Sequence, residues 1–301
     1  MCTALKYQDT MGRNFDYEVS YGEEIVKIPR EEFGNDFAVI GIAMVYTDAN
    51  GSYPLLYDGM NEYGLCMAGL AFEGNAYYFS QDEFEQMNNK HKIKAYDVIL
   101  SVLGKCSNVQ QVKKMMSNSI IVDNQISKNI HNSDMHWFVC DEKESIIIEQ
   151  TKDGMDWYDA ETGVLTNNPV YPKQLAQHTA NKGLIGQFKA SYHTRGNETE
   201  GLNGSYTSAG RFQRVSYLKE KLEEFYTPKS DEDKVNQTFH LLASVEQLYG
   251  ATPVNDKFEY TIYSVIYNMN NLSVEIKKYD NFYVGKTYLS YDLDSFVRTK
   301  I

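Results

Sequence analysis

Apolar residues in the first half of the chain recur in runs of strand length. Phe37–Tyr46 is an almost continuous apolar run, which is typical of a strand buried on both faces. Tyr53–Phe72 predicts further strands, separated by a turn at Asn61–Gly64. Trp157–Thr166 predicts another strand. Two pairs of runs also predict β-hairpins, namely His136–Cys140 with Ser145–Gln150 and Glu259–Met269 with Leu272–Tyr279.

Four other segments carry apolar residues at helical spacing. In one of them, Ser107 and Gln110 have the spacing of a capping box. In the last two, the apolar positions extend to Phe225 and to Leu248. The predicted helices are Ala95–Leu103, Cys106–Met116, Arg211–Phe225 and Lys234–Tyr249.

The order of these elements predicts sheets covered by helices on their outer faces. The order fits a Rossmann domain poorly, and the sequence contains no GxGxxG or GxxxxGK[ST] motif. Ile185–Ser208 is rich in Gly, Ser, Thr and Asn and predicts a long loop, either functional or a surface insertion.

The amino-acid composition and net charge exclude some classes of function. The chain has 301 residues, of which 42% are hydrophobic and 23% charged, as in ordinary globular proteins. Its net charge of −12 repels phosphate backbones, so we expect no nucleic-acid partner. No apolar run reaches the length of a membrane span, and no signal peptide is evident, so we expect a cytoplasmic protein without a membrane role.

The four cysteines are far apart and form no CxxC pair, which argues against a disulfide framework and a structural zinc site. Cys2 differs from the others because it becomes the N-terminal residue if Met1 is removed. Its thiol and a free α-amine would then share one carbon and provide a nucleophile and a base in one residue. Cys66, Cys106 and Cys140 lie in apolar surroundings and are interpreted as small core residues.

Other polar residues could complete a site around Cys2. If Cys2–Tyr7 is a strand, an antiparallel return would bring Arg13 and Asp16 beside it. An arginine there favours the thiolate, and a carboxylate can orient an amine; the alternative is a surface ion pair. Asn167 follows a predicted strand and can donate to an oxyanion, although Asn-Pro also favours a plain turn. Arg211 lies at a helix start, where the helix dipole does not prefer arginine.

The six histidines show no HExxH or other metal-ligand spacing, so we expect no metal or other cofactor. His136 is interpreted as a packed or hydrogen-bonded core residue. A Cys–His hydrolase using an internal thiol remains an alternative, since such pairs are distant in sequence.

Several ordered motifs together resemble the choloylglycine hydrolase family, which includes bile salt hydrolases and penicillin V acylases. They span most of the chain in the family's order. The motifs are Met1-Cys2-Thr3, Gly12–Asp16 (GRNFD), Asp58–Leu65 (DGMNEYGL), Met67–Leu70, Met135–Trp137, Ile148–Thr151, Gly163–Pro169 (GVLTNNP) and Arg211–Val215 (RFQRV).

This resemblance implies an α+β, four-layer αββα N-terminal-nucleophile hydrolase fold, with two stacked antiparallel sheets between helical layers. It implies one domain over residues 2–301 after removal of Met1, and a bacterial, cytoplasmic homotetramer. By matched position, Cys2 is the nucleophile, with Arg13, Asp16, Asn167 and Arg211 around it, and Ala71 supplies a backbone oxyanion donor.

The resemblance implies hydrolysis of a linear amide C–N bond, with conjugated bile salts as the first expectation. Ala71 departs from the family, because bile salt hydrolases carry Asn and many penicillin V acylases carry Tyr there. Penicillin V, another N-acyl amide and an N-acyl homoserine lactone therefore stay open as substrates, and so does a ligand-binding role if Met1 is retained. Candidates for the wall of the acyl site are Phe15, Val19, Ile130 and Met135.

Overall fold

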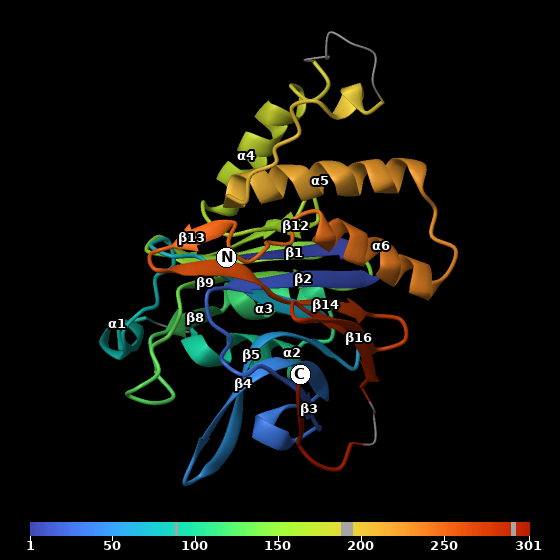
Figure 1. Ribbon diagram of the computed structural model, residues 1–301. Coiled ribbons are helices and arrows are strands. Elements are labelled where there is room, and N and C mark those ends of the chain that lie inside the picture. The colour runs from blue at the N-terminus through green and yellow to red at the C-terminus, as the bar shows by residue number, and fades with distance from the viewer. Residues whose placement is uncertain (88–89, 188–194, 290–292) are drawn as a thin grey trace.

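The computed structural model describes residues 1–87, 90–187, 195–289 and 293–301, and its elements form four layers (Figure 1). Two antiparallel sheets lie face to face in the middle. Helices α5 (Ser208–Phe225) and α6 (Asp231–Ala243) pack on one sheet, and α4 (Tyr171–Lys182) packs on α5. Helices α2 (Val98–Leu103) and α3 (Val109–Ser117) cover the other sheet. The expected αββα fold is confirmed.

The first sheet has the order β12-β1-β2-β14-β15-β16, with β13 also paired to β14. Its two N-terminal strands form the hairpin that the sequence predicts. The second strand of this hairpin pairs with a strand from the last fifth of the chain. The strands are β1 (Cys2–Tyr7), β2 (Thr10–Tyr17), β12 (Val164–Leu165), β13 (Thr252–Val254), β14 (Lys257–Asn268), β15 (Ser273–Lys278) and β16 (Asn281–Tyr288).

The second sheet has the order β11-β10-β9-β6-β5-β4-β3-β17. Its strands are β3 (Glu24–Ile28), β4 (Val39–Asp48), β5 (Gly51–Asn61), β6 (Cys66–Ala71), β9 (Met135–Cys140), β10 (Ser145–Thr151), β11 (Gly154–Asp159) and β17 (Val297–Lys300). A separate parallel pair joins β7 (His91–Lys94) to β8 (Ser119–Val122). Short helical turns are η1 (Glu32–Gly34), α1 (Gln81–Glu85), η2 (Ala95–Asp97) and η3 (Asn197–Thr199).

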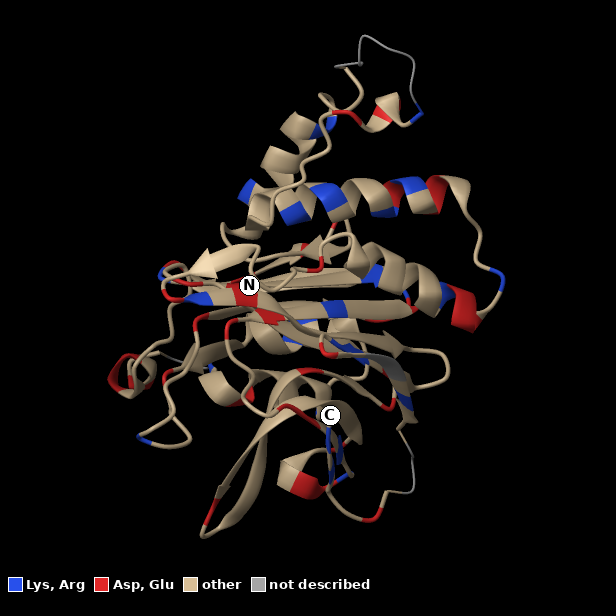
Figure 2. Ribbon diagram, viewed as in Figure 1, with Lys and Arg blue, Asp and Glu red and all other residues tan. Residues whose placement is uncertain are grey.

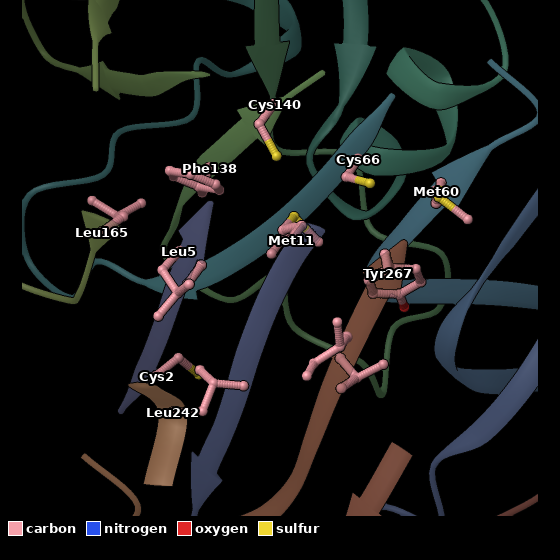
Figure 3. Packing of buried hydrophobic residues seen from close by; sticks show 14 of the residues in the cluster. Cys2, Leu5, Met11, Met60, Cys66, Phe138, Cys140, Leu165, Leu242 and Tyr267 are labelled. Carbon is pink, nitrogen blue, oxygen red and sulfur yellow. The ribbon is translucent and has the colours of Figure 1, made fainter. Parts of the chain in front are cut away.

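Two apolar clusters hold the layers together. The larger one fills the space between the sheets, where Cys2 and Tyr267 lie in one layer of side chains, and it continues to α5 and α6 (Figure 3). The smaller cluster lies between the second sheet and the pair α2 and α3. Gly12 lets α6 approach β2 closely, because a Cβ atom there would lie 2.6 Å from Thr238 Cγ2.

The structure corrects four local expectations. The N-cap of α3 is Asn108 rather than Ser107, since the Asn108 side chain accepts from the Gln111 N–H. Trp157–Thr166 is not one strand, because β11 and β12 belong to different sheets. Helix α6 ends at Ala243, and the predicted apolar positions at the ends of both long helices, Phe225 and Leu248, are exposed.

Charged residues of both signs are interspersed over the visible side of the molecule (Figure 2). In the part of the chain that the structure describes, no helix is long and apolar enough to cross a membrane. Of the predicted loop 185–208, residues 188–194 lie outside the described ranges, and residues 197–199 form the turn η3.

Candidate active site

The hairpin of β1 and β2 places Arg13 beside the Cys2 thiol. Cys2 is the first residue of β1 and pairs with Phe15 of β2. Side chains two residues apart share one face of a strand, so Arg13 and Phe15 both point into the space between the sheets. Arg13 Nη2 lies 3.4 Å from Cys2 Sγ, and Cys2 is buried. A guanidinium at this distance stabilises a thiolate.

Arg13 is fully buried and held by groups from both sheets. Nη1 donates to Asp58 on β5 and, at 2.6 Å, to the Tyr263 hydroxyl on β14. Nη2 also donates to the Gly69 carbonyl on β6 at 2.9 Å. Burial opposes the charge of Arg13, but its polar neighbours outweigh burial and raise its pKa. The guanidinium therefore stays charged.

Asn167 connects the N-terminus to the second sheet. Its Oδ1 accepts from the Cys2 backbone N–H at 2.7 Å and from Arg211 Nη2 at 2.7 Å. Its Nδ2 donates to the Ala71 carbonyl at 2.9 Å. Because an amide nitrogen has two hydrogens, one N–H remains for a substrate oxygen close to Ala71.

Arg211 holds the backbone of Cys2. It lies in the first turn of α5, whose N-cap Thr207 accepts from the Gly210 N–H. Its Nη1 donates to the Cys2 carbonyl at 2.5 Å and to Thr3 Oγ1 at 2.7 Å. Burial lowers the pKa of Arg211. The side chain thus crosses from the helix layer through to the strand that carries Cys2.

The Asp16 carboxylate lies next to the site but faces other partners. It accepts from Thr261 Oγ1 at 2.6 Å and from Gln247 Nε2 at 2.9 Å, and Arg211 Nη1 is 3.8 Å away. With Met1 attached, the Cys2 nitrogen donates to Asn167 rather than to this carboxylate. The Met1 ammonium donates to the Asp16 carbonyl at 2.7 Å.

A second buried acid, Glu259, lies beside the N-terminus of the chain and was not predicted from the sequence. Glu259 Oε1 is 2.7 Å from the Met1 ammonium and accepts from Gln247 Nε2 at 2.9 Å. Asp58 and Tyr263 were likewise not predicted as neighbours of Arg13. The motif DGMNEYGL contains Asp58, but nothing local to that motif shows which strand its side chain faces.

The predicted acyl-site residues do not all lie together. Phe15 stacks between Tyr57 and Tyr263, with ring centroids 4.8 and 5.2 Å away. Met135 packs against the cluster under α2 and α3, on the other face of the second sheet. Its methyl group fills the space that a side chain at residue 69 would take.

Val19 lies two residues after β2 and Ile130 in the segment before β9, and both are partly exposed. Their contact with a bound acyl group stays a prediction. Of the four candidates, Phe15 is the one whose ring contacts the side chain of Arg13, with the guanidinium carbon 4.7 Å from the ring centroid.

The three internal thiols are buried, and burial disfavours the thiolate in two of them. Cys66, Cys106 and Cys140 are buried, and burial raises the pKa of the Cys66 thiol and raises that of Cys106 to about 11. A raised thiol pKa leaves little thiolate to act as a nucleophile.

His136 contacts groups other than cysteine. Its ring stacks on Phe72, with centroids 4.3 Å apart, and Nε2 donates to the Thr166 carbonyl at 2.8 Å. Nδ1 lies 3.1 Å from Glu149 Oε1. This is the hydrogen-bonded core histidine that the sequence predicts, and it supports the backbone next to Asn167.

Comparison with known proteins decides the family. The family described as "Linear amide C-N hydrolases, choloylglycine hydrolase family" matches residues 2–295. The chain belongs to this family. Its members cleave linear amide C–N bonds, and the chain is accordingly a hydrolase of that class.

Relatives in the choloylglycine hydrolase family cover nearly the whole chain. A bile salt hydrolase/transferase of Lactiplantibacillus plantarum is 37% identical over 97% of this chain and 93% of the relative. One from Clostridium perfringens is 34% identical over 88% of this chain and 85% of the relative.

Solved structures agree with the family fold. A mutant of conjugated bile acid hydrolase from Clostridium perfringens superposes with a TM-score of 0.89 at 30% identity, covering 100% of this chain and 97% of that chain. Penicillin V acylase from Agrobacterium tumefaciens has a TM-score of 0.76 at 15% identity, covering 99% and 90%, and shares the fold.

Proposed function

We propose that this member of the choloylglycine hydrolase family hydrolyses glycine- and taurine-conjugated bile salts with Cys2 as its N-terminal nucleophile. The observation that carries the proposal is the convergence of Arg13, Asn167 and Arg211 on Cys2 from three separate parts of the chain. The bile salt hydrolase/transferases that are 37% and 34% identical supply the substrate class.

The reaction begins once Met1 is removed and the Cys2 nitrogen becomes a free α-amine. That amine takes the thiol proton, and Sγ forms a bond to the amide carbon. The oxyanion accepts hydrogen bonds from Asn167 Nδ2 and from the Ala71 N–H. The protonated amine then gives its proton to the leaving nitrogen as the C–N bond breaks, which leaves a thioester and a free amine product.

Water completes the cycle. The α-amine takes a proton from water, and the hydroxide adds to the thioester carbon. The same oxyanion donors hold the second tetrahedral intermediate. The C–S bond breaks, the acid leaves, and the thiolate recovers the proton from the amine. No step in this cycle calls for a metal or an organic cofactor.

Arg13 and Arg211 divide two tasks in this scheme. Arg13 faces Sγ and stabilises the thiolate, while Arg211 holds the Cys2 carbonyl and the Asn167 amide in place. Asp16 neutralises Arg211 from the helix side at 3.8 Å. Phe15, which pairs with Cys2 across β1 and β2, is the candidate for contact with the acyl group.

We also propose that the enzyme acts as a homotetramer. Large apolar side chains that are exposed in the single chain would then be covered by neighbouring subunits. They include Tyr249 and Leu248, which are 61% and 59% exposed. A molar mass near that of one chain in solution would contradict the tetramer.

The substrate test is an amine-release assay with glycine- and taurine-conjugated bile salts and with penicillin V. Wild type and Cys2→Ala are compared, and intact mass shows whether Met1 is absent. Turnover of bile salts by wild type alone supports the proposal. Turnover of penicillin V with little bile salt cleavage would contradict the substrate class and keep the mechanism.

A further inference from the structure

The hydrogen bonds that hold the Arg13 guanidinium beside Cys2 come mainly from strands other than its own. It starts on β2 in the first sheet, but Asp58 and Gly69, which its guanidinium contacts, lie in the second sheet. Its Nε is buried and has no hydrogen-bond partner in the described structure. The direction of the guanidinium therefore depends on what holds its two Nη atoms.

Asp58 is the charged group among these contacts. Its Oδ2 accepts from Arg13 Nη1 and, at 2.6 Å, from the Tyr263 hydroxyl. Its Oδ1 accepts from the Tyr267 hydroxyl. Asp58, Arg13, Tyr263 and Tyr267 are all fully buried. Both carboxylate oxygens are thus occupied, and the carboxylate cannot rotate without breaking a hydrogen bond in a dry interior.

The two tyrosines act as fixed donors. Burial raises the pKa of both Tyr263 and Tyr267 well above the ordinary value, and the nearby Asp58 raises both further. Each hydroxyl therefore keeps its proton over the whole range in which an enzyme works. The Tyr263 hydroxyl also accepts from Arg13 at 2.6 Å. It therefore bridges the guanidinium and the Asp58 carboxylate, which also contact each other directly.

We propose that Asp58, oriented by Tyr267 and Tyr263, is a positioning residue that aims the Arg13 guanidinium at the Cys2 thiol. Asp58 does not touch the reacting atoms and acts through Arg13. The inference rests on the proposed role of Cys2 as nucleophile. It names in addition the side chains that orient the Arg13 guanidinium toward the Cys2 thiol.

Two different roles for Asp58 predict opposite effects of Asp58→Asn on the amount of Cys2 thiolate. If Asp58 contributed only its negative charge to the region, replacing it by Asn would make the site more positive and would favour the thiolate. If Asp58 aims Arg13, the same change lets the guanidinium turn away and disfavours the thiolate. The charged and titratable groups that face this region are Cys2, Arg13, Asp16, Tyr57, Asp58, Cys66, Arg211, Glu259, Tyr263 and Tyr267.

The test measures Cys2 alkylation by iodoacetamide as a function of pH, read on the N-terminal peptide by mass spectrometry. Protein lacking Met1 is used for wild type, Asp58→Asn and Tyr267→Phe. We expect the alkylation midpoint of Asp58→Asn to move to higher pH and its kcat to fall about 10²-fold, with a smaller change in KM. Tyr267→Phe should change both in the same direction, with about a tenfold loss.

Tyr7→Phe is the matched control. The Tyr7 hydroxyl is buried in the same apolar cluster and has no hydrogen-bond partner in the described structure. We expect this variant to keep the wild-type midpoint and activity. An equal effect of Tyr7→Phe and Tyr267→Phe would overturn the proposal, because the loss would then follow from any buried hydroxyl.

The outcomes separate this inference from the proposed function. A folded Asp58→Asn variant with an unchanged or lowered midpoint overturns the positioning role while wild type still hydrolyses its amide. Wild type without amide hydrolysis overturns the proposed function, and the alkylation profiles still decide the role of Asp58. If Asp58→Asn does not fold, Tyr267→Phe and Tyr7→Phe decide it.

Discussion

The Cys2 backbone nitrogen donates a 2.7 Å hydrogen bond to Asn167 Oδ1, a contact between residues 165 positions apart. Arg211 Nη2 donates to the same oxygen at the same distance. Two donors on one atom fix which way the amide points, so its Nδ2 faces Ala71. In the proposed mechanism, this contact orients both the nitrogen that becomes the α-amine and the N–H that meets the oxyanion.

Asn167→Ala should lower kcat by roughly 10²–10³-fold, because one oxyanion donor is lost. Steady-state amine release on wild type and variant measures this. Asn168→Ala is the neighbouring control, since Asn168 is exposed and its side chain donates to the Glu73 carbonyl. Comparable losses in the two variants would place the effect in the turn rather than in the oxyanion site.

Arg211→Ala should reduce both stability and activity. It breaks a buried ion pair and frees the Cys2 carbonyl, which we expect to cost about 3–5 kcal/mol of unfolding free energy. Denaturant unfolding and amine release are measured together.

Arg214→Ala provides the comparison from the next turn of the same helix. Arg214 donates to the carbonyls of Ser244, Asn203 and Ser205, away from Cys2. This variant should lose stability while the folded fraction keeps its turnover. Full turnover in folded Arg211→Ala would remove that residue from the site.

His178 should make the fold sensitive to acid. Burial lowers its pKa, its Nδ1 has no hydrogen-bond partner in the described structure, and its ring packs edge-on against Phe212. The unfolded chain takes up a proton at the ordinary histidine pKa and the folded chain resists it. Unfolding free energy therefore falls as pH drops below that value, by at most about 1.4 kcal/mol per pH unit.

Denaturant unfolding between about pH 7.5 and about pH 5.5 tests this for wild type and His178→Leu. The variant should show a smaller loss across that interval. His131→Leu is the control, since His131 is exposed. Equal acid sensitivity in wild type and His178→Leu would assign the pH dependence to other groups.

Sequence patterns predicted the parts of the fold that depend on neighbouring residues. The hairpin of β1 and β2 follows from two short strands with a tight connection, and it was enough to bring Arg13 to Cys2. The β9–β10 and β14–β15 hairpins follow from the same logic. The family resemblance added the fold and the contributions of Asn167 and Arg211, because no local pattern connects residues so far apart.

The sequence could not show contacts made across the space between the sheets. Asp58, Tyr263 and Tyr267 meet only because two sheets stack, and the residues next to each of them in the sequence do not show which partners it contacts. For Met135, strand alternation alone already indicated which face of the sheet its side chain occupies. It alternates with His136, so it shares a strand face with Trp137 two residues on, and that face packs on the helices under the second sheet.

Trapping the acyl-enzyme tests most directly whether Cys2 is the nucleophile. Enzyme lacking Met1 is mixed with a conjugated bile salt, quenched in acid within one turnover and digested for mass spectrometry. We expect to find the acyl mass on the peptide that begins with Cys2, and we expect it to be absent in Cys2→Ala. An acyl group on Cys66, Cys106 or Cys140, or continued turnover by Cys2→Ala, would contradict this role of Cys2.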